Sequence, residues 1–235
     1  MKRIIFVLML VIIACSLLSC GAESDTELYL VRQTVTENGR VTTVNYYYDE
    51  NYMMVKNETL AGDISDTVCE ISYDKNGYMN YMKGVSKSGL VTEMFLINDE
   101  LGRVVEERLT STYNGTVTEN ASTYEYIDDN GSYVRTTTLG ATAGRVVTVT
   151  KDEFGNEKKS VDTLGQTAVC VNKYEGGLLV EVKTTVSNNS KMTVTVAKYE
   201  YDGYGNVTKV TRYNNVGDVI GTETYEYSSN VSFAN

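Results

Sequence analysis

The sequence contains no histidine, no proline and no tryptophan among its 235 residues. Without histidine the usual general base and the commonest metal ligand are missing, so Ser-His-Asp and Cys-His sites are excluded. The carboxylate pair Asp128-Asp129 falls in a turn, and Glu106-Glu107 would point to opposite faces of any strand. We therefore expect a protein that is not an enzyme and has no cofactor and no metal site.

Long apolar runs are scarce as well, and the main one, Ile4 to Ile13, is too short to span a bilayer comfortably. The residues after it, Leu17-Leu18-Ser19-Cys20, resemble the lipobox of bacterial lipoprotein signal peptides, in which cleavage precedes a cysteine that is then acylated. The resemblance implies a signal peptide over 1–19 and lipidation at Cys20. The alternative is an ordinary secretory signal with a chance cysteine at the cleavage site. Both readings imply export from the cytoplasm.

Positive charge is in short supply, because 21 basic residues face 31 acidic ones and the formal net charge is −10. Removing Lys2 and Arg3 with the signal peptide makes it −12. An acidic protein repels phosphates and anionic head groups, so nucleic acid is an unfavourable partner and an acylated Cys20 would have to hold the chain to membrane lipid. Residues 20–27 are small and acidic and are interpreted as a lipidated tether, followed by one domain over 28–235.

Tyrosine, threonine and valine are plentiful, with 19 tyrosines alone, and this is a β-sheet composition. In the stretch Lys198 to Thr208, apolar Ala197, Tyr199 and Tyr201 alternate with charged residues, which predicts a strand, and Asp202 to Gly205 predicts a turn. Weaker copies of this pattern recur along the chain. They alternate with shorter turns such as Asn38-Gly39 and Asn114-Gly115, the strongest type of hairpin signal.

Turns therefore fall about every 12 to 13 residues, and each unit of about 25 residues predicts one β-hairpin. The sequence predicts an all-β antiparallel meander of about sixteen strands, formed by eight hairpins in a curved, spiral or rolled sheet, with a helix only in the signal peptide. Counting back from each turn acid, the positions expected on the buried face are mostly apolar: Tyr48, Tyr46 and Val44; Tyr73, Ile71 and Cys69; Asn98, Leu96 and Met94; Tyr201, Tyr199 and Ala197.

Three apolar residues fall on the face that is expected to be exposed to solvent, namely Tyr47, Phe95 and Ile97. Exposed apolar side chains that gather on a surface mark contact sites for ligands or partners. These three residues are therefore the candidate contact patch.

The segment Tyr199 to Thr208 resembles the YD repeat of Rhs-type proteins, whose units read roughly Tyr-x-Tyr-Asp-x-x-Gly-Asn or Gly-Arg. Tyr73 to Gly77, Asp99 to Arg103 and Asp152 to Asn156 carry weaker copies. In that family the repeats form long antiparallel strips that spiral into a hollow shell around a toxic domain. The resemblance implies the repeat architecture; this chain is far shorter and has no Asp-Pro core motif.

Cys69 and Cys170 lie five positions before a turn acid, on the same face of equivalent strands. Export makes a disulfide between them feasible. In a closed sixteen-stranded barrel they would lie on opposite walls, beyond the reach of about 7 Å between Cα atoms that a disulfide tolerates, whereas a spiral could bring them together. Our hypothesis is that both are unpaired and buried.

The function we expect is a membrane-anchored lipoprotein of the bacterial cell envelope, with its domain outside the cytoplasm, acting as a non-catalytic binding or scaffold module. Its partner would be an unidentified protein, glycan or apolar ligand. An alternative is a carrier that holds a lipid or other apolar ligand in a rolled sheet, and several charged residues lining the interior would argue against it. A hydrolase that acts through carboxylates is a third reading.

Replacing the lipobox cysteine tests the anchor. Cys20→Ser should abolish acylation and release the protein from the membrane fraction, because the acyl chains provide the membrane affinity. Metabolic lipid labelling and cell fractionation measure the two effects. Undiminished membrane retention of the variant, together with no lipid label on the wild type, would contradict the lipobox interpretation.

Overall fold

The computed structural model describes residues 27–62, 64–139, 142–188 and 191–234. The predicted signal peptide and Cys20 lie outside the described residues. The described strands are β1 Tyr29–Glu37, β2 Arg40–Tyr48, β3 Met54–Ala61, β4 Ile64–Tyr73, β5 Met79–Ser86, β6 Val91–Asn98, β7 Val104–Tyr113, β8 Thr116–Tyr126, β9 Tyr133–Leu139, β10 Thr142–Lys151, β11 Glu157–Asp162, β12 Gln166–Glu175, β13 Leu178–Asn188, β14 Lys191–Tyr201, β15 Val207–Tyr213, β16 Val219–Ser228 and β17 Ser232–Phe233.

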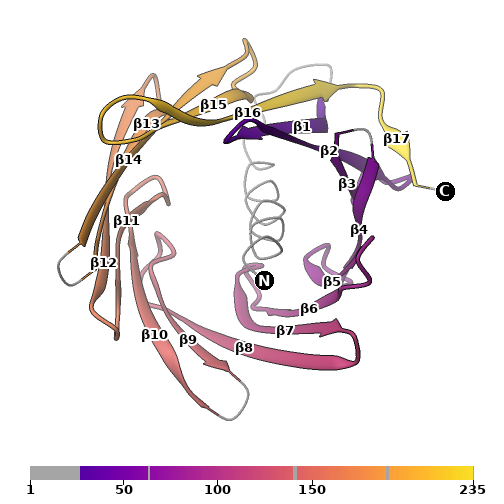
Figure 1. The fold of residues 1–235 in the computed structure, drawn as a ribbon, viewed down its shortest axis with the longest axis horizontal. Helices are drawn as coiled ribbons and strands as arrows, with labels where there is room; N and C mark the ends of the chain where they lie inside the picture. The colour runs from indigo at the N-terminus through magenta and orange to yellow at the C-terminus, as the bar shows by residue number, and fades with distance from the viewer. Residues whose placement is uncertain (1–26, 63, 140–141, 189–190, 235) are drawn as a thin grey trace.

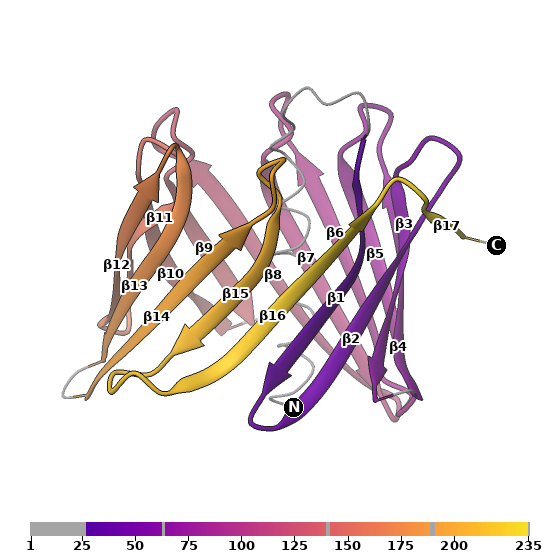
Figure 2. The same cartoon turned by 90° about the horizontal axis from the view of Figure 1, so that it is seen from above.

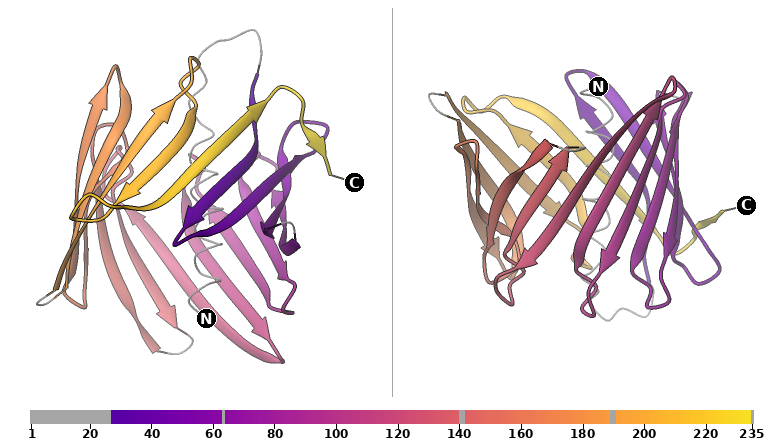
Figure 3. Two further views of the ribbon diagram at one scale, coloured as in Figure 1. Left: turned by 45° about the horizontal axis from the view of Figure 1, so that its top comes forward. Right: turned by 90° about the horizontal axis from the view of Figure 1, so that it is seen from below.

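The strands β1 to β16 form one antiparallel meander in which each strand pairs with the next along the chain. The first and last members also pair, from Tyr29 opposite Ser228 to Glu37 opposite Gly221, so the sheet closes into a barrel of tilted strands (Figures 1 and 2). The short β17 adds a parallel bridge beside the end of β2 (Figure 3).

The prediction of eight hairpins and sixteen antiparallel strands is confirmed, and no helix occurs in the described residues. The prediction of a spiral or rolled sheet is wrong, because the sheet is closed. Pairing β1 with β16 satisfies the two backbone edges that an open meander would leave unpaired, which is the physical advantage of closure.

Most turns at one end of the barrel, after even-numbered strands, share one structure built on an aspartate. In the turn from Asp202 to Asn206, the Oδ1 atom of Asp202 accepts hydrogen bonds from the backbone N–H groups of Tyr204 and Asn206, each at 2.9 Å. Gly205 donates its N–H to the carbonyl of Asp202 and has φ of +86°, a conformation that favours glycine. The turns at Asp49, Asp74, Asp99 and Asp152 repeat the Oδ1 contacts.

The tyrosine before the acid has a separate role. The hydroxyl of Tyr201 donates to the carbonyl of Leu179 at 2.7 Å, and Tyr73 does the same to Met54 at 2.7 Å. Each of these carbonyls lies at or next to the first residue of the other strand of the tyrosine's hairpin. The tyrosine side chain therefore links the two strands at the end of the hairpin opposite its turn. Tyr48 and Tyr126 repeat the contact, and the Asn98 amide replaces the hydroxyl in β6.

The two faces of the wall differ sharply in burial. Apart from β17, the described chain forms a single closed layer, so nothing covers the outside and a large side chain becomes buried only by pointing inward. Tyr46, Met82 and Met94 are at most 2% exposed and share one face. The inward row of cross-strand neighbours runs from Ile71 through Met82 and Met94 to Leu109. The predicted alternation of the faces is confirmed at these strands.

Removing one turn acid should weaken the barrel measurably. Asp202→Ala deletes the acceptor of two backbone N–H groups, and we expect a loss of about 1–2 kcal/mol in the free energy of unfolding. Asp202→Asn keeps an Oδ1 acceptor and should lose less, since Asn214 makes the same two contacts in its own turn. Urea unfolding of the three chains measures the difference, and equal losses in both variants would contradict this role.

The turn acids also predict acid sensitivity. Burial alone would raise the pKa of Asp202, but hydrogen bonds from Asn206, Tyr204 and Gly205 outweigh it, so its pKa lies below the usual 3.8. Burial would likewise raise the pKa of Asp152, but hydrogen bonds from Tyr174 and Asn172 lower it. A carboxyl whose pKa is lowered on folding contributes stability above the unfolded pKa and loses it as the pH falls from about 4 toward the folded pKa.

We therefore expect the urea concentration at the unfolding midpoint to decrease as the pH is lowered below about 4. The decrease should be less steep for Asp202→Asn, which has one fewer such carboxyl. Unfolding curves at a series of pH values measure this. Parallel pH profiles for the two proteins would contradict the contribution of Asp202.

Candidate functional site

Charged side chains recur across the outer face of the barrel. Four outward residues on consecutive strands form a row of alternating sign, which we call the outer charge row: Lys56, Glu70, Lys83 and Glu93 are cross-strand neighbours from β3 to β6. Further round the wall Lys209 pairs with Glu200 at 2.9 Å, and near the seam Arg32 pairs with Glu226 at 3.5 Å. Cross-strand pairs of opposite charge favour the register.

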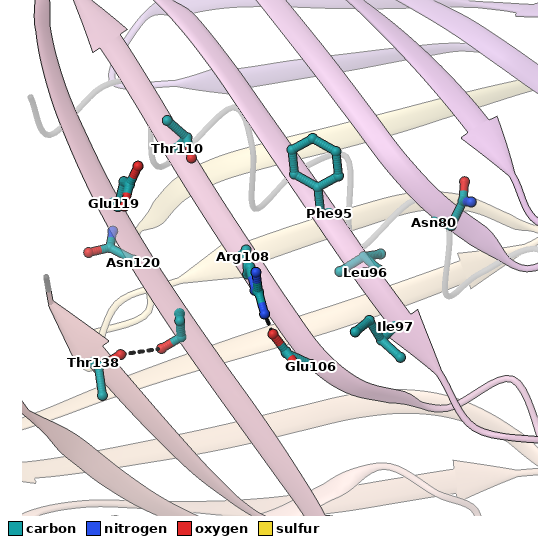
Figure 4. Close-up of a pocket in the computed structure, with 11 residues that line it drawn as sticks. Asn80, Phe95, Leu96, Ile97, Glu106, Arg108, Thr110, Glu119, Asn120 and Thr138 are labelled. Atoms are coloured by element: carbon teal, nitrogen blue, oxygen red, sulfur yellow. Dashed lines mark hydrogen bonds and ion pairs between the residues drawn. The ribbon is translucent and has the colours of Figure 1, made fainter.

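A groove of about 760 Å³ lies on the outer face across β5 to β9 (Figure 4). Phe95 and Ile97 line it from β6 and are 49% and 52% exposed. Tyr81 packs against Phe95 with 4.8 Å between ring centroids, and Arg108 is the cross-strand neighbour of Phe95 on the other side. Arg108 forms an ion pair with Glu106 at 2.6 Å, so the groove has an apolar centre and a charged edge.

The structure brings two of the three predicted patch residues together. Tyr47 lies on β2, separated from β6 by three strands, and is part-buried. Its hydroxyl donates to Glu58 at 3.1 Å, and the Lys56 ammonium lies 5.0 Å from its ring centroid. The sequence did not indicate Tyr81 or Arg108, because cross-strand neighbours depend on a register that period-2 alternation does not fix.

The inner face of β3 to β6 is mainly apolar and carries no charge among its described residues. We call this surface the inner arc. Its inward positions are Met54, Asn57, Thr59, Ala61, Thr67, Cys69, Ile71, Tyr73, Asn80, Met82, Gly84, Ser86, Thr92, Met94, Leu96 and Asn98. Gly84 has no side chain beside Cys69, and a Cβ atom at this position would lie 3.1 Å from the Cys69 Sγ atom.

A buried polar network borders the inner arc at the closing seam. The Tyr46 hydroxyl donates to Gln33 Oε1 at 2.9 Å, and Gln33 Nε2 donates to Glu223 Oε2 at 3.2 Å. Tyr225 also donates to Glu223, and Arg212 forms an ion pair with the same carboxylate. Burial first, and then the charge of Glu223, raise the pKa of Tyr225, so its proton stays in place at neutral pH.

Two polar side chains beside this network have no hydrogen-bond partner. Asn57 is completely buried, and neither its amide nitrogen nor its amide oxygen has a partner; Thr59 is 2% exposed, and its hydroxyl has none. Both point inward: Asn57 is the cross-strand neighbour of Tyr46, and Thr59 is that of Val44. An unmatched buried amide or hydroxyl costs on the order of 1–3 kcal/mol, so such residues are uncommon without a role.

The opposite part of the interior is more polar. Arg145 forms an ion pair with Asp162, which is buried, and Tyr124 donates to Glu107 at 3.0 Å. Together with Arg212 and Glu223, these are the several charged interior residues that argue against a carrier whose whole lumen holds an apolar ligand. No group of three or more His, Cys, Asp or Glu side chains in the described chain could hold a metal ion.

Both cysteines in the described chain are free. Cys69 lies in β4 and Cys170 in β12, eight strands apart around the closed barrel. Burial raises the pKa of Cys69 to about 11 and also raises that of Cys170, whose Sγ lies 3.5 Å from the Thr184 hydroxyl. Cys69 is buried and Cys170 only partly so.

Comparisons with known proteins bear on the fold. No family model and no curated protein matches the sequence. A crystal structure of a porin-like protein from Bacteroides vulgatus is similar, with a TM-score of 0.57 and 11% identity over 86% of this chain and 99% of that one. A porin-like protein from Bacteroides uniformis has a TM-score of 0.52 and 13% identity over 85% and 96%.

The fold is that of a porin-like barrel. At these identities the likeness concerns the fold alone. The described residues contain no helix long and apolar enough to cross a membrane.

Proposed function

We propose that the protein is a lipid-anchored, non-catalytic binding module of the bacterial cell envelope. Its YD-like hairpins form a barrel that stands in water beside the membrane, tethered through acylated Cys20. The observation that carries this proposal is the polarity of the wall, which is charged outside and largely apolar on the inner arc.

The outer charge row supports a barrel in water. A barrel embedded in lipid presents an apolar band about 25 Å tall, and a lysine or arginine facing the bilayer centre costs about 2–4 kcal/mol. Here Lys56 and Lys83 alternate with Glu70 and Glu93 within their strands, and charged pairs recur at β13 to β15. The membrane contact is therefore assigned to the acyl chains of Cys20.

A non-catalytic role is supported by the state of the buried carboxylates. Glu223 is neutralised by Arg212 and accepts hydrogen bonds from Gln33 and Tyr225. Asp162 is neutralised by Arg145 and accepts two further bonds from backbone N–H groups. Burial alone would raise the pKa of Asp162, but hydrogen bonds from Gln166, Arg145 and Leu164 outweigh it and hold the pKa below the usual 3.8, so Asp162 is a poor proton acceptor at neutral pH.

The outer groove is proposed as the binding surface. It combines the exposed apolar side chains of Phe95 and Ile97 with the charged edge formed by Arg108 and Glu106. Binding sites for small molecules are typically apolar surfaces with a few polar groups that fix orientation.

The placement of the barrel can be tested without knowing the ligand. The Cys20→Ser chain, purified without detergent, should stay soluble and monodisperse, and it should neither float with liposomes nor release a dye trapped inside them. Size-exclusion chromatography and liposome flotation measure this. A chain that needs detergent, or that makes liposomes leak, would show a membrane-spanning barrel instead.

A matched variant tests whether the outer charges are responsible. Glu70→Leu combined with Lys83→Leu replaces the two central charges of the outer charge row with apolar side chains and should shift the chain toward aggregates or the liposome fraction. Thr43→Val, at an outward position of β2, serves as the control and should leave solubility unchanged. If the double variant behaves like the control, the outer charge row does not determine where the barrel resides.

A further inference from the structure

We infer that one end of the barrel rests on the surface of a lipid bilayer whose head groups are zwitterionic. This end, which we call the tether rim, carries the start of β1, the end of β16 and the turns after the even-numbered strands (Figure 2). The inference goes beyond the binding function and rests on the proposed anchor at Cys20.

Apolar residues lie exposed at the turns of the tether rim. Leu101, Phe154 and Tyr204 occupy the third position of their aspartate turns and are 72%, 54% and 53% exposed. Tyr52 and Ile127 add exposed side chains in two further turns. The five residues follow β2, β6, β8, β10 and β14, so they are spread around the circumference of the rim. A flat apolar surface can contact side chains arranged in this way.

Tyr52 is exposed although its backbone is strained. Its φ is +60°, in the left-handed region, and it fills the fourth position of its turn. The same position in other turns of this rim is held by Gly77, Gly102, Gly155 and Gly205. A bulky residue in this conformation is uncommon, and such strain is concentrated at functional positions. The Tyr52 ring stacks on that of Tyr29 at 5.0 Å and lies 6.1 Å from that of Phe233, which is also exposed.

The proposed anchor is attached at the same rim. β1 begins at Tyr29, directly after the predicted tether over 20–27. The tether can span at most about 30 Å, so an anchor at Cys20 keeps the tether rim near the bilayer. Tilted strands of about ten residues place the opposite rim roughly 25 Å farther away. Aromatic side chains are typical of the boundary between lipid head groups and acyl chains, so the composition of the rim suits this position.

Acidic side chains on the tether rim select the kind of lipid. A second acid directly follows the turn aspartate at Glu50, Glu100, Asp129 and Glu153. An anionic bilayer would repel these side chains, and salt would weaken the repulsion. The apolar residues are also separated from one another, so the rim adds to the anchor and does not replace it. The Cys20→Ser chain should therefore not bind vesicles by itself.

A single tryptophan can report which rim meets lipid, because the chain contains neither tryptophan nor histidine. The Cys20→Ser chain, with a hexahistidine tag in place of residues 1–19, is held on phosphatidylcholine vesicles by a nickel-chelating lipid. Tyr204→Trp labels the tether rim, and Leu164→Trp labels the same turn position after β11, on the opposite rim. Brominated acyl chains should quench most of the Tyr204→Trp emission and leave the Leu164→Trp emission unchanged.

Paired variants test the apolar residues directly. In the Tyr204→Trp chain, Leu101→Ser with Phe154→Ser should remove most of the quenching. Leu164→Ser with Val216→Ser changes the same turn position on the opposite rim and should leave the quenching unchanged. All four residues are exposed, so the variants should stay folded, which their melting temperatures check. Adding phosphatidylglycerol to the vesicles should reduce the quenching at low salt, and added salt should restore it.

Equal quenching of the two tryptophans would overturn the inference, since the barrel would then span the bilayer or lie on its side. No quenching of either would overturn it too, because the rim would stand clear of the lipid. Equal effects of the two paired variants would have the same consequence. The tag replaces the acyl chains, so none of these outcomes depends on acylation. A failure of the proposed anchor would appear instead as a missing lipid label on the wild type.

Discussion

Most joints between successive hairpins depend on one contact, in which a carboxylate oxygen accepts the backbone N–H groups two and four residues further along. This contact turns the chain sharply enough for the next strand to pair, and the preceding tyrosine, by donating to the start of its neighbouring strand, fixes the end of the hairpin just completed. The two residues act in sequence: tyrosine closes one unit and aspartate begins the next. The repeat is therefore a joint, which Tyr-Asp forms at Tyr48-Asp49, Tyr73-Asp74 and Tyr201-Asp202.

Closure then separates the two faces of every strand into an inside and an outside. A single layer cannot bury both faces, so the large apolar side chains of β2 to β6 converge in the interior, while the charges there are confined to paired groups such as Arg212 with Glu223. A barrel that faces lipid presents an apolar band on its outside. The likeness to porin-like proteins from Bacteroides concerns the fold alone, so the proposed placement of this barrel in water depends on the polarity of its outward residues.

The hairpin period, the strand count and the inward face were predictable, because all three depend on residues close together in the sequence. Asp202 and Gly205 mark a turn whatever surrounds them, and Val44, Tyr46 and Tyr48 share a face by alternation alone. Closure was not predictable in this way, since the pairing of β1 with β16 joins segments from opposite ends of the chain.

The same limit applies to the candidate site. Gln33 and Glu223 are 190 residues apart in sequence, and only the seam brings them together. Nothing in the sequence distinguishes Asn57 from an ordinary polar strand residue. Its inward position becomes evident only from its pairing with Tyr46. Phe95 and Ile97 were recognised because the alternation places these apolar side chains on the outer face. Tyr47 was chosen by the same rule, but contacts with Lys56 and Glu58 on the next strand shield it.

The seam between β1 and β16 has a consequence for the growth of this architecture. All other pairings among β1 to β16 join strands that follow each other in the chain, so a hairpin with its own tyrosine and aspartate contains the contacts needed to extend the wall. Inserting or deleting one such hairpin changes the strand number by two, preserves the antiparallel match at the seam, and alters the circumference without altering any joint. The diameter of the lumen is thus set by the number of repeats, and chains of different length can form the same kind of barrel with interiors of different size.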